Sequence, residues 1–437
     1  MRPHLRFTAS VLIAGSLALG MASVSEAGHT PASATPPKLH AGVTIHVGDY
    51  WTAAKDDPNR AIVARLAKIW QKKTGVNVVL DGPFSRDKFL TAAPAGQAPD
   101  LIGVPHDQVA TLETGKTLAP VPAWAWTPAE KKLYIRAAIQ ATILAGKTYS
   151  MPWSIETTGL FYNKALVPAS FFKPKAGKKY VTWAQVIAKS RSMTDQANNT
   201  FGIAWDITNF YFSYAIVSES GGYVFKYTKK GYDWKKIGLD TSGAIHGFQF
   251  LRDLTTQGKY KLMPDSITYD TASGLFRQGK LAFWLTGPWE QAAMKKANIN
   301  FGFTPVPSMD GKHASHPFSG VQVFAVNAFS SHKNEAFAFL SYITRAMQLP
   351  EFRGAGLIPV LKSAINSKAV QHDPIARGLS QAALGAQPMP NIPEMQQVWP
   401  PMATALSSLV KGQVSASGAA HIAVQTIQAD IAKAHGG

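Results

Sequence analysis

PNRAIVARLAKIWQKKTGVNVVL, residues 58–80, decides the fold class of this 437-residue chain. The stretch predicts a helix that begins at Pro58 and stops at Gly75, because apolar side chains recur in it at helical spacing. Those side chains are Ile62, Leu66, Ile69 and Trp70. The segment VNVVL, residues 76–80, follows at once and predicts a strand. A helix that leads straight into a strand is typical of α/β proteins.

The segments on both sides continue this alternation. VTIHV, residues 43–47, predicts a strand before the helix, because its apolar residues alternate. RDKFLTAA, residues 86–93, predicts a short helix, and PDLIGV, residues 99–104, predicts a third strand. The resulting β-α-β-α-β order predicts a parallel sheet.

The second half of the chain contains a similar mixture of elements. Strands are predicted at 201–207, 280–285 and 319–328, and helices at 240–258, 269–278, 332–345 and 413–435. The roughly 395 residues from Gly42 onward exceed what one hydrophobic core usually organises. We therefore expect two domains.

The first 41 residues are expected to lie outside the folded domains. Residues 1–27 combine a basic start, an apolar run and a small residue before Gly28, which predicts a signal peptide, with a retained membrane anchor as the alternative. Residues 28–41 are a Pro-rich, flexible lead-in. The chain has no cysteine, which excludes disulfides, thiolate metal sites and a lipid-modified N-terminal cysteine. These features predict a protein free in the periplasm, with secretion as the alternative.

The charge is strongly positive, with 44 Lys and Arg against 26 Asp and Glu, a formal net charge of +18. Nucleic-acid binding is one interpretation of such a charge. The basic runs at 173–179 and 229–236 stand beside Gly and Pro, however, and are expected to be solvated loops, so no nucleic-acid partner is predicted. The shortage of carboxylates suggests a second hypothesis, an acidic habitat.

The sequence contains none of the motifs that mark common catalytic or cofactor sites. It has no phosphate-binding loop, dinucleotide fingerprint, HExxH or GxSxG motif, so no cofactor is expected. His313 and His316 have ligand-like spacing, but they lie in a Gly/Pro loop in which no carboxylate is expected nearby, so a metal site there is the lesser interpretation. A glycosidase would need a paired acid and base, and acidic residues are few.

Polar and aromatic residues follow the predicted strands, where ligands of parallel sheets bind. Asp49, Asp107, Glu156 and Asn209 can accept hydrogen bonds from hydroxyl groups. Tyr211, Tyr269, Trp289 and Trp399 offer flat apolar faces. A sugar ring needs both kinds of partner, so the set predicts sugar binding without chemistry. The alternatives are that the tryptophans fill the core and that Asp49 and Asp107 only cap helices.

Five segments carry a resemblance to a known family. They are LFYNKALVP at 160–168, YFSYAIV at 211–217, ESGGYVFKYTKKGYDWKKIGLDTSGA at 219–244, LTGPWE at 285–290 and PMPNIPEM at 388–395. In this order they closely resemble segments of the periplasmic maltose/maltodextrin-binding proteins of ABC importers, and the likeness runs from about Val43 to the end.

The resemblance implies an α/β fold of two lobes, each a mostly parallel sheet flanked by helices, joined by crossing hinge linkers. It implies an N-terminal lobe of residues 42–153 and 319–370 and a C-terminal lobe of residues 154–318 and 371–437. It also implies a monomeric, non-enzymatic protein that closes on a maltose-like oligosaccharide and delivers it to a membrane permease.

Carried over by position, Asp49, Asp107 and Glu156 resemble the family's acidic acceptors of sugar hydroxyls, and Tyr211, Trp289 and Trp399 resemble its stacking residues. Tyr269 and Met389 resemble residues that line the same cleft, where the prolines of 388–400 would hold Met389 and Trp399 in place.

Several positions depart from the family pattern. Tyr50 and Asn209 stand where the family has a lysine and a glutamate, Val104 and Gln108 replace a tryptophan and an arginine, and Ala403 replaces an arginine. These changes remove charged hydrogen bonds and one stacking face, so another disaccharide such as trehalose or sucrose is an alternative ligand. A glycoside hydrolase that uses Glu156 and Asp107 is the enzymatic rival.

Overall fold

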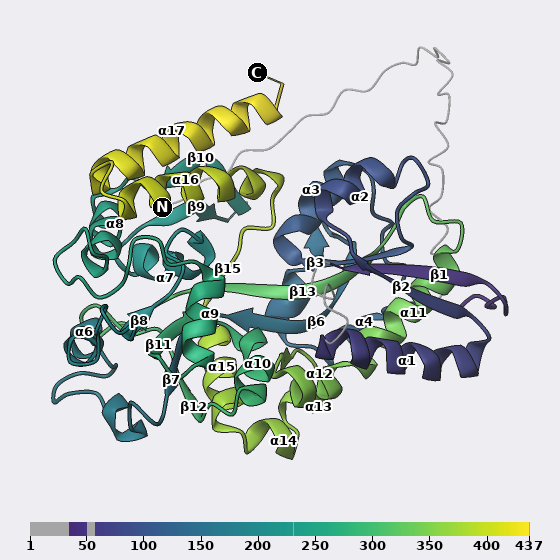
Figure 1. Ribbon diagram of the computed structural model, residues 1–437. Helices are drawn as coiled ribbons and strands as arrows, with labels where there is room; N and C mark the ends of the chain where they lie inside the picture. Colours follow the sequence, from purple (N-terminus) through teal and green to yellow (C-terminus); the bar gives the residue numbers. More distant parts are fainter. Residues whose placement is uncertain (1–34, 50–56, 230, 437) are drawn as a thin grey trace, which may run out of the picture.

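The computed structural model describes residues 35–49, 57–229 and 231–436. The signal peptide predicted at 1–27, the first part of the lead-in, and Tyr50 therefore lie outside the described residues. Most strands gather in two sheets that lie side by side in Figure 1, each with helices packed against it.

The larger sheet has the strand order β14-β6-β13-β3-β1-β2, with β15 paired to β13. Its strands are β1 (Thr44–Asp49), β2 (Asn77–Pro83), β3 (Leu101–Pro105), β6 (Ser150–Thr157), β13 (Phe318–Val326), β14 (Ile358–Pro359) and β15 (Gln387–Pro388). Strand β1 runs parallel to β2 and β3, which confirms the parallel β-α-β-α-β unit predicted from residues 43–104. Strand β13 runs antiparallel to both β3 and β6.

The helices α1 (Pro58–Thr74), α2 (Arg86–Ala92), α3 (Val109–Thr114), α4 (Pro128–Lys131), α5 (Arg136–Gln140), α11 (Lys333–Ala346) and α12 (Gln348–Ala355) accompany this sheet. Helix α1 starts where the side chain of Asp57 accepts a hydrogen bond from the backbone N–H of Asn59 at 2.7 Å. It ends at Gly75, whose φ of 75° is a conformation that glycine adopts without strain.

The smaller sheet has the order β12-β7-β11-β8. Its strands are β7 (Gly159–Asn163), β8 (Phe201–Ala204), β11 (Leu281–Thr286) and β12 (Phe301–Thr304). The helices in this half of the molecule are α6 (Trp183–Arg191), α7 (Phe210–Glu219), α8 (Ser242–Leu254), α9 (Tyr269–Arg277), α10 (Gln291–Lys296), α16 (Trp399–Val410) and α17 (Ala416–Ala434). Only the β11–β8 pairing in this sheet is parallel.

The expectation of mostly parallel sheets is therefore wrong in detail, although the α/β class is right. Parallel pairing requires a crossover from one end of a sheet to the other. Strand β7 follows β6 after the single residue Thr158 but belongs to the other sheet, where it pairs antiparallel with β11 and β12. Strand β13 follows β12 of the smaller sheet after the loop 305–317. It enters the larger sheet antiparallel to β3 and β6.

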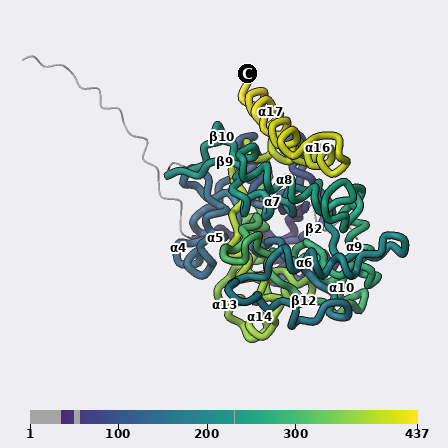
Figure 2. The backbone as a smooth tube through the Cα atoms, turned by 90° about the vertical axis from the view of Figure 1, so that its left-hand side faces the viewer, coloured from purple at the N-terminus to yellow at the C-terminus, as the bar shows by residue number. Residues whose placement is uncertain are grey.

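The chain thus passes between the two sheets several times. The predicted lobe boundary at residues 153 and 154 falls inside β6, and the boundary at 318 and 319 falls at the start of β13. Helices α13 (Lys362–Ile365), α14 (Lys368–Gln371) and α15 (Pro374–Gly385) precede β15, opposite α17 in Figures 1 and 2. The assignment of segments to two lobes remains a prediction.

Two short hairpins complete the secondary structure, β4 (Ile143–Leu144) with β5 (Lys147–Thr148) and β9 (Tyr223–Thr228) with β10 (Gly231–Gly238). The basic run at 229–236 was expected to be a loop, and most of it is strand β10. Among the described residues, no helix is both long enough and apolar enough to cross a membrane.

Candidate functional site

A cavity with a volume of about 750 Å³ lies between the two halves of the molecule. The predicted residues Asp107 and Glu156 line it from the side of the larger sheet. Asn209, Tyr211, Tyr269 and Trp289 line it from the side of the smaller sheet, and Met389 and Trp399 line it from the C-terminal segment. The structure therefore brings eight of the predicted site residues together around one space of the size that small ligands occupy.

Asp107 presents a buried carboxylate to this cavity. It belongs to the short 3-10 helix η1 (His106–Gln108) that follows β3, and its side chain accepts hydrogen bonds on Oδ2 from Trp399 Nε1 at 3.3 Å and Gln396 Nε2 at 3.0 Å. Its other oxygen, Oδ1, is buried and has no hydrogen-bond partner among the described residues. A buried acceptor without a donor costs free energy, so Asp107 is ready to accept a hydrogen bond from a ligand.

Glu156 is the second acidic group at the cavity. Its side chain projects from β6, and Oε2 accepts a hydrogen bond from Gln322 Nε2 on β13 at 2.8 Å. Burial raises the pKa of Glu156 to about 7, although the bond from Gln322 acts in the opposite direction. Near neutral pH this carboxyl group can therefore either donate or accept a hydrogen bond.

Tyr269 and Trp289 are joined in a chain of hydrogen bonds. Trp289 Nε1 donates to the hydroxyl of Tyr269 at 2.6 Å, and this hydroxyl donates to Glu290 Oε1. The other oxygen of Glu290 accepts from Ser273 at 3.3 Å. Because the polar edges of both rings have protein partners, their apolar faces remain for a ligand.

Tyr211 and Phe212 extend this aromatic surface from the first turn of α7. Tyr211 lies 6.2 Å from Trp289 between ring centres, and Phe212 stacks on Tyr269 at 5.7 Å. Asn209 caps the same helix, since its side chain accepts a hydrogen bond from the N–H of Tyr211 at 3.1 Å. Asn209 thus has a structural role in addition to its place at the cavity.

Neither Asp49 nor Asp107, the two aspartates considered as helix caps, caps one of the described helices that follow them. Helix α1 is capped by Asp57 and not by Asp49, and η1 and α3 begin without a side-chain cap from Asp107. Asp49 is also the one predicted site residue that does not line the described cavity. It is buried, and together with Asp57 its charge helps burial to raise the pKa of Glu351 well above its usual range.

His106 fixes the position of Met389. Its Nε2 lies 3.2 Å from the Met389 carbonyl oxygen, and its Nδ1 lies 3.1 Å from the backbone nitrogen of Val321. Nδ1 can accept this bond only if it carries no proton, so the ring is neutral with its proton on Nε2. Burial lowers the pKa of His106, which favours this neutral form.

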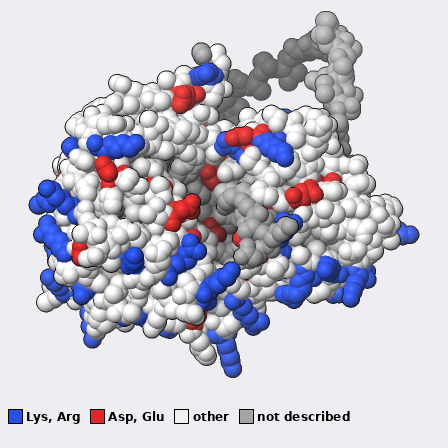
Figure 3. Space-filling model, in the orientation of Figure 1, with Lys and Arg blue, Asp and Glu red and all other residues white. Residues whose placement is uncertain are grey.

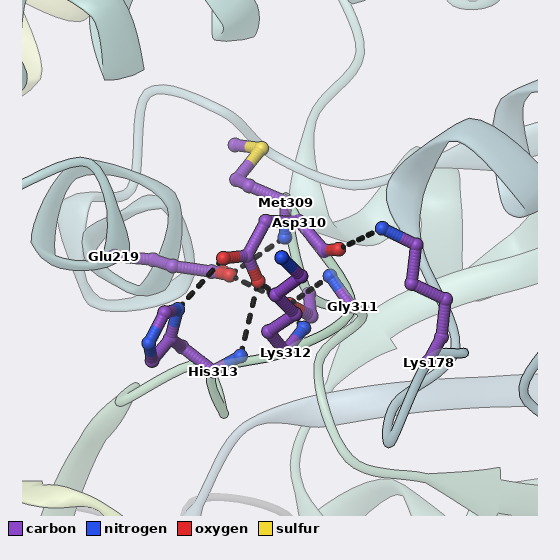
Figure 4. Close-up of polar contacts among 8 residues, drawn as sticks. Lys178, Glu219, Met309, Asp310, Gly311, Lys312 and His313 are labelled. Carbon is purple, nitrogen blue, oxygen red and sulfur yellow. Dashed lines mark hydrogen bonds and ion pairs between the residues drawn. The ribbon is translucent and has the colours of Figure 1, made fainter.

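The two histidines of loop 305–317 have separate partners. His313 Nδ1 contacts Asp310 Oδ2 at 2.7 Å, so the expectation that no carboxylate lies nearby was wrong (Figure 4). His316 Nδ1 instead lies 2.8 Å from the Gly385 carbonyl oxygen. Asp310 also accepts hydrogen bonds from the backbone of Lys312 and His313, which lower its pKa and hold the turn. No cluster of three potential metal ligands occurs in the described part of the chain.

The charge around the cavity differs from that of the protein as a whole. The described residues that line it include Asp57, Asp107, Glu156 and Glu290 but no lysine or arginine. On the face shown in Figure 3, blue side chains lie mainly along the left and lower edges, and several red ones lie toward the centre. The described lining of the cavity is therefore acidic, although the protein as a whole carries a net positive charge.

Comparison with known proteins identifies the family. The family model described as bacterial extracellular solute-binding protein matches residues 65–378, which is more than half of the chain. The chain belongs to the bacterial extracellular solute-binding protein family. As a member of this family it is an extracytoplasmic solute-binding protein and not an enzyme, so the hydrolase alternative is excluded.

Three relatives show what this solute-binding protein is similar to. The galactooligosaccharide-binding protein of Bacillus subtilis (strain 168) is 28% identical over 377 residues, which cover 84% of this chain and 86% of the relative. The maltotriose-binding protein of Pyrococcus abyssi is 30% identical over 334 residues, covering 75% of this chain and 69% of the relative. The structure of the maltose-maltodextrin binding protein of Alicyclobacillus acidocaldarius matches with a TM-score of 0.78 and 34% identity, covering 88% of this chain and 100% of that chain. These findings confirm the α/β periplasmic-binding-protein fold.

Sequence reasoning missed several polar residues of this solute-binding protein's cavity. Gln322, Gln396 and Glu290 all line it. Gln396 lies within the proline-rich stretch 388–400, and Glu290 directly follows Trp289, so proximity to predicted residues was the available signal. Gln322 lies in the middle of a buried strand, and nothing in its sequence context indicated a site.

Proposed function

We propose that this protein captures maltose- or maltodextrin-like oligosaccharides in the periplasm and delivers them to the membrane permease of an ABC importer. The observation that carries the proposal is the composition of the cavity wall. The wall combines the aromatic side chains of Tyr211, Trp289 and Trp399 with buried acceptors at Asp107 and Glu156. No cluster of three potential metal ligands occurs among the described residues. Apolar C–H faces and hydroxyl groups of a sugar ring match these two kinds of partner.

The proposed mechanism is closure of the two halves on the sugar. Because both halves contribute side chains to the cavity, a ligand that fills it contacts both and stabilises the closed arrangement by its differential affinity. The permease would then recognise the closed, liganded form of a single chain. The polypeptide segments between the two sheets would act as the hinge.

The sugar itself is a separate question within this proposal. Two of the relatives compared above are a galactooligosaccharide-binding protein and a maltotriose-binding protein. Malto- and galacto-oligosaccharides are therefore the first ligands to test. Gln108 lines the cavity where the resembled family has an arginine, so one charged donor to the sugar is replaced by an amide. Trehalose and sucrose remain alternatives for the same reason.

Calorimetric titration with a panel of sugars tests the proposal. Maltose, maltotriose, a galacto-oligosaccharide, trehalose and sucrose form the panel, and cellobiose serves as a β-linked comparison. We expect maltotriose to bind in the micromolar range or tighter and to change the fluorescence of Trp289 and Trp399. Absence of binding to every sugar in the panel would refute the proposed function, whereas tightest binding of a galacto-oligosaccharide, trehalose or sucrose would correct only the ligand.

A further inference from the structure

Asp107 is held so that only one of its two carboxylate oxygens is left for a ligand. Oδ2 receives two donors, while the buried Oδ1 receives none from the part of the chain that the structure describes. The donors come from far along the chain, Gln396 from the 3-10 helix η4 (Pro393–Gln397) and Trp399 from the start of α16. The same contacts therefore fix both the carboxylate and the aromatic ring beside it.

Gln396 makes this arrangement depend on the orientation of one amide. Its Nε2 donates at 3.0 Å both to the backbone oxygen of Asp107 and to Oδ2 of the same residue. If the amide were turned over, its oxygen would face two acceptors and neither bond could form. These two bonds therefore favour the observed orientation from the side of Asp107.

Arg86, on helix α2, favours the same orientation from the other side of the amide. Its Nη1 donates to Gln396 Oε1, and a guanidinium group can only donate, so the amide oxygen must face Arg86 and the nitrogen must face Asp107. Asp87 in turn holds Arg86, with 2.8 Å between Arg86 Nε and Asp87 Oδ1. Arg86 does not line the cavity itself, and its side chain is 22% exposed.

We propose that Arg86 and Gln396 are positioning residues for oligosaccharide binding, which orient Asp107 so that its Oδ1 accepts a sugar hydroxyl. This proposal rests on the proposed function. It assigns part of the affinity for the sugar to Arg86, a cation that does not line the cavity. Gln108, which stands where the resemblance places an arginine, cannot supply a positive charge there. A purely structural tie between η1 and η4 would use the same contacts, so the test must separate the two roles.

Gln396→Glu tests the orientation by reversing the group that faces Asp107. At pH 8 the introduced carboxylate would place an acceptor against Oδ2, and we expect the Kd for maltotriose to rise about 30-fold relative to the unmodified protein. At pH 5 a proton shared by the two carboxyls restores a donor, so the ratio should fall to about threefold. The other charged or titratable groups near this network or cavity are present in both proteins, so their own titration largely cancels in the ratio. Among the described residues they are Asp57, Arg86, Asp87, His106, Glu156, Glu290, and Glu394 with its partner His435 at the end of α17.

Arg86→Met tests the remote cation. We expect about tenfold weaker maltotriose binding with little change at pH 5 relative to pH 8. Combined with Gln396→Ala, it should weaken binding no further than Gln396→Ala alone, because the amide that Arg86 orients is already gone. Arg65→Met, which removes an exposed arginine from α1, is the matched control and should bind as the unmodified protein does.

The outcomes separate this proposal from the proposed function. A ratio for Gln396→Glu that does not change with pH, unchanged affinity of Arg86→Met, or additive losses in the double variant would each overturn the positioning role while maltotriose still binds the unmodified protein. A purely structural tie predicts lower melting temperatures without the pH-dependent ratio. If the unmodified protein binds no sugar at all, it is the proposed function that fails.

Discussion

Replacing Glu156 by glutamine should change the pH dependence of stability in a predictable way. Burial raises the pKa of Glu156 from 4.5 to about 7 in the folded protein, and unfolding returns it to its usual range. Binding of this proton therefore stabilises the folded state. Its contribution to the unfolding free energy is fully present below pH 4.5 and is lost as the pH rises through 7. A rise of that size corresponds to about 3 kcal/mol of unfolding free energy.

Glu156→Gln keeps an oxygen that can accept from Gln322 but removes the titration. Both proteins are measured without sugar, and the unfolding free energy of the unmodified protein is subtracted from that of the variant. This difference should be larger at pH 8 than at pH 5 by roughly 2 to 3 kcal/mol. Urea unfolding at pH 5, 6, 7 and 8, followed by circular dichroism, measures this difference. Asp87→Asn, at a side chain that is 76% exposed, is the control.

A constant difference between variant and unmodified protein across this pH range would refute the reasoning. His106, whose pKa burial lowers, acts in the opposite direction, but burial also raises the pKa values of Glu219, Glu290 and Glu351, so these three groups make the folded protein more stable as the pH falls from 8 to 5. This direction agrees with the acidic habitat suggested by the shortage of carboxylates. A collapse of stability below about pH 4 would count against that hypothesis.

Three further predictions concern the cavity wall. Trp399→Ala should weaken maltotriose binding about tenfold or more in calorimetric titration, and unchanged affinity would show that its ring does not contact the sugar. Tyr269→Phe removes the hydroxyl between Trp289 and Glu290 and should lower the unfolding free energy by about 1 to 3 kcal/mol in urea titrations, whereas an unchanged value would mean that water replaces it. Gly320→Ala adds a methyl group at the cavity, 3.3 Å from Met389 Cε and 3.6 Å from the Tyr211 hydroxyl oxygen. It should reduce the affinity for maltotriose severalfold while the melting temperature stays within a few degrees. Tighter binding of this last variant would show that the sugar does not approach Gly320.

The sequence was most informative where one strand or helix determines the position of a residue. Trp289 follows a buried strand and Tyr211 lies in the first turn of a helix, so their places at one end of the sheet could be inferred from local pattern. The proline-rich stretch likewise brought Met389 and Trp399 to the cavity as expected. Asp49, at the end of β1, is buried near the carboxyl group of Glu351 and does not line the described cavity, so its part in ligand binding stays a prediction.

Contacts between distant segments could not be predicted in this way. The link from Arg86 to Gln396 joins residues 310 positions apart, and neither has a sequence context that indicates the other. The directions of β13 and β7 also escaped prediction, since they depend on which sheet each strand joins and not on its own residues. Local patterns specify elements, whereas the pairing of elements depends on the whole chain.

The interleaving of the two sheets has a consequence for synthesis and export. Strand β6 lies between β13 and β14, and its neighbour β13 also pairs with β15, so the larger sheet cannot be completed until residues 318–326, 358–359 and 387–388 have been made. A nascent chain that has emerged only as far as the middle of its length therefore lacks the partners of its own central strand. Such a chain should stay extended and accessible to the machinery that threads polypeptides across a membrane, and it would reach its final form only on the far side.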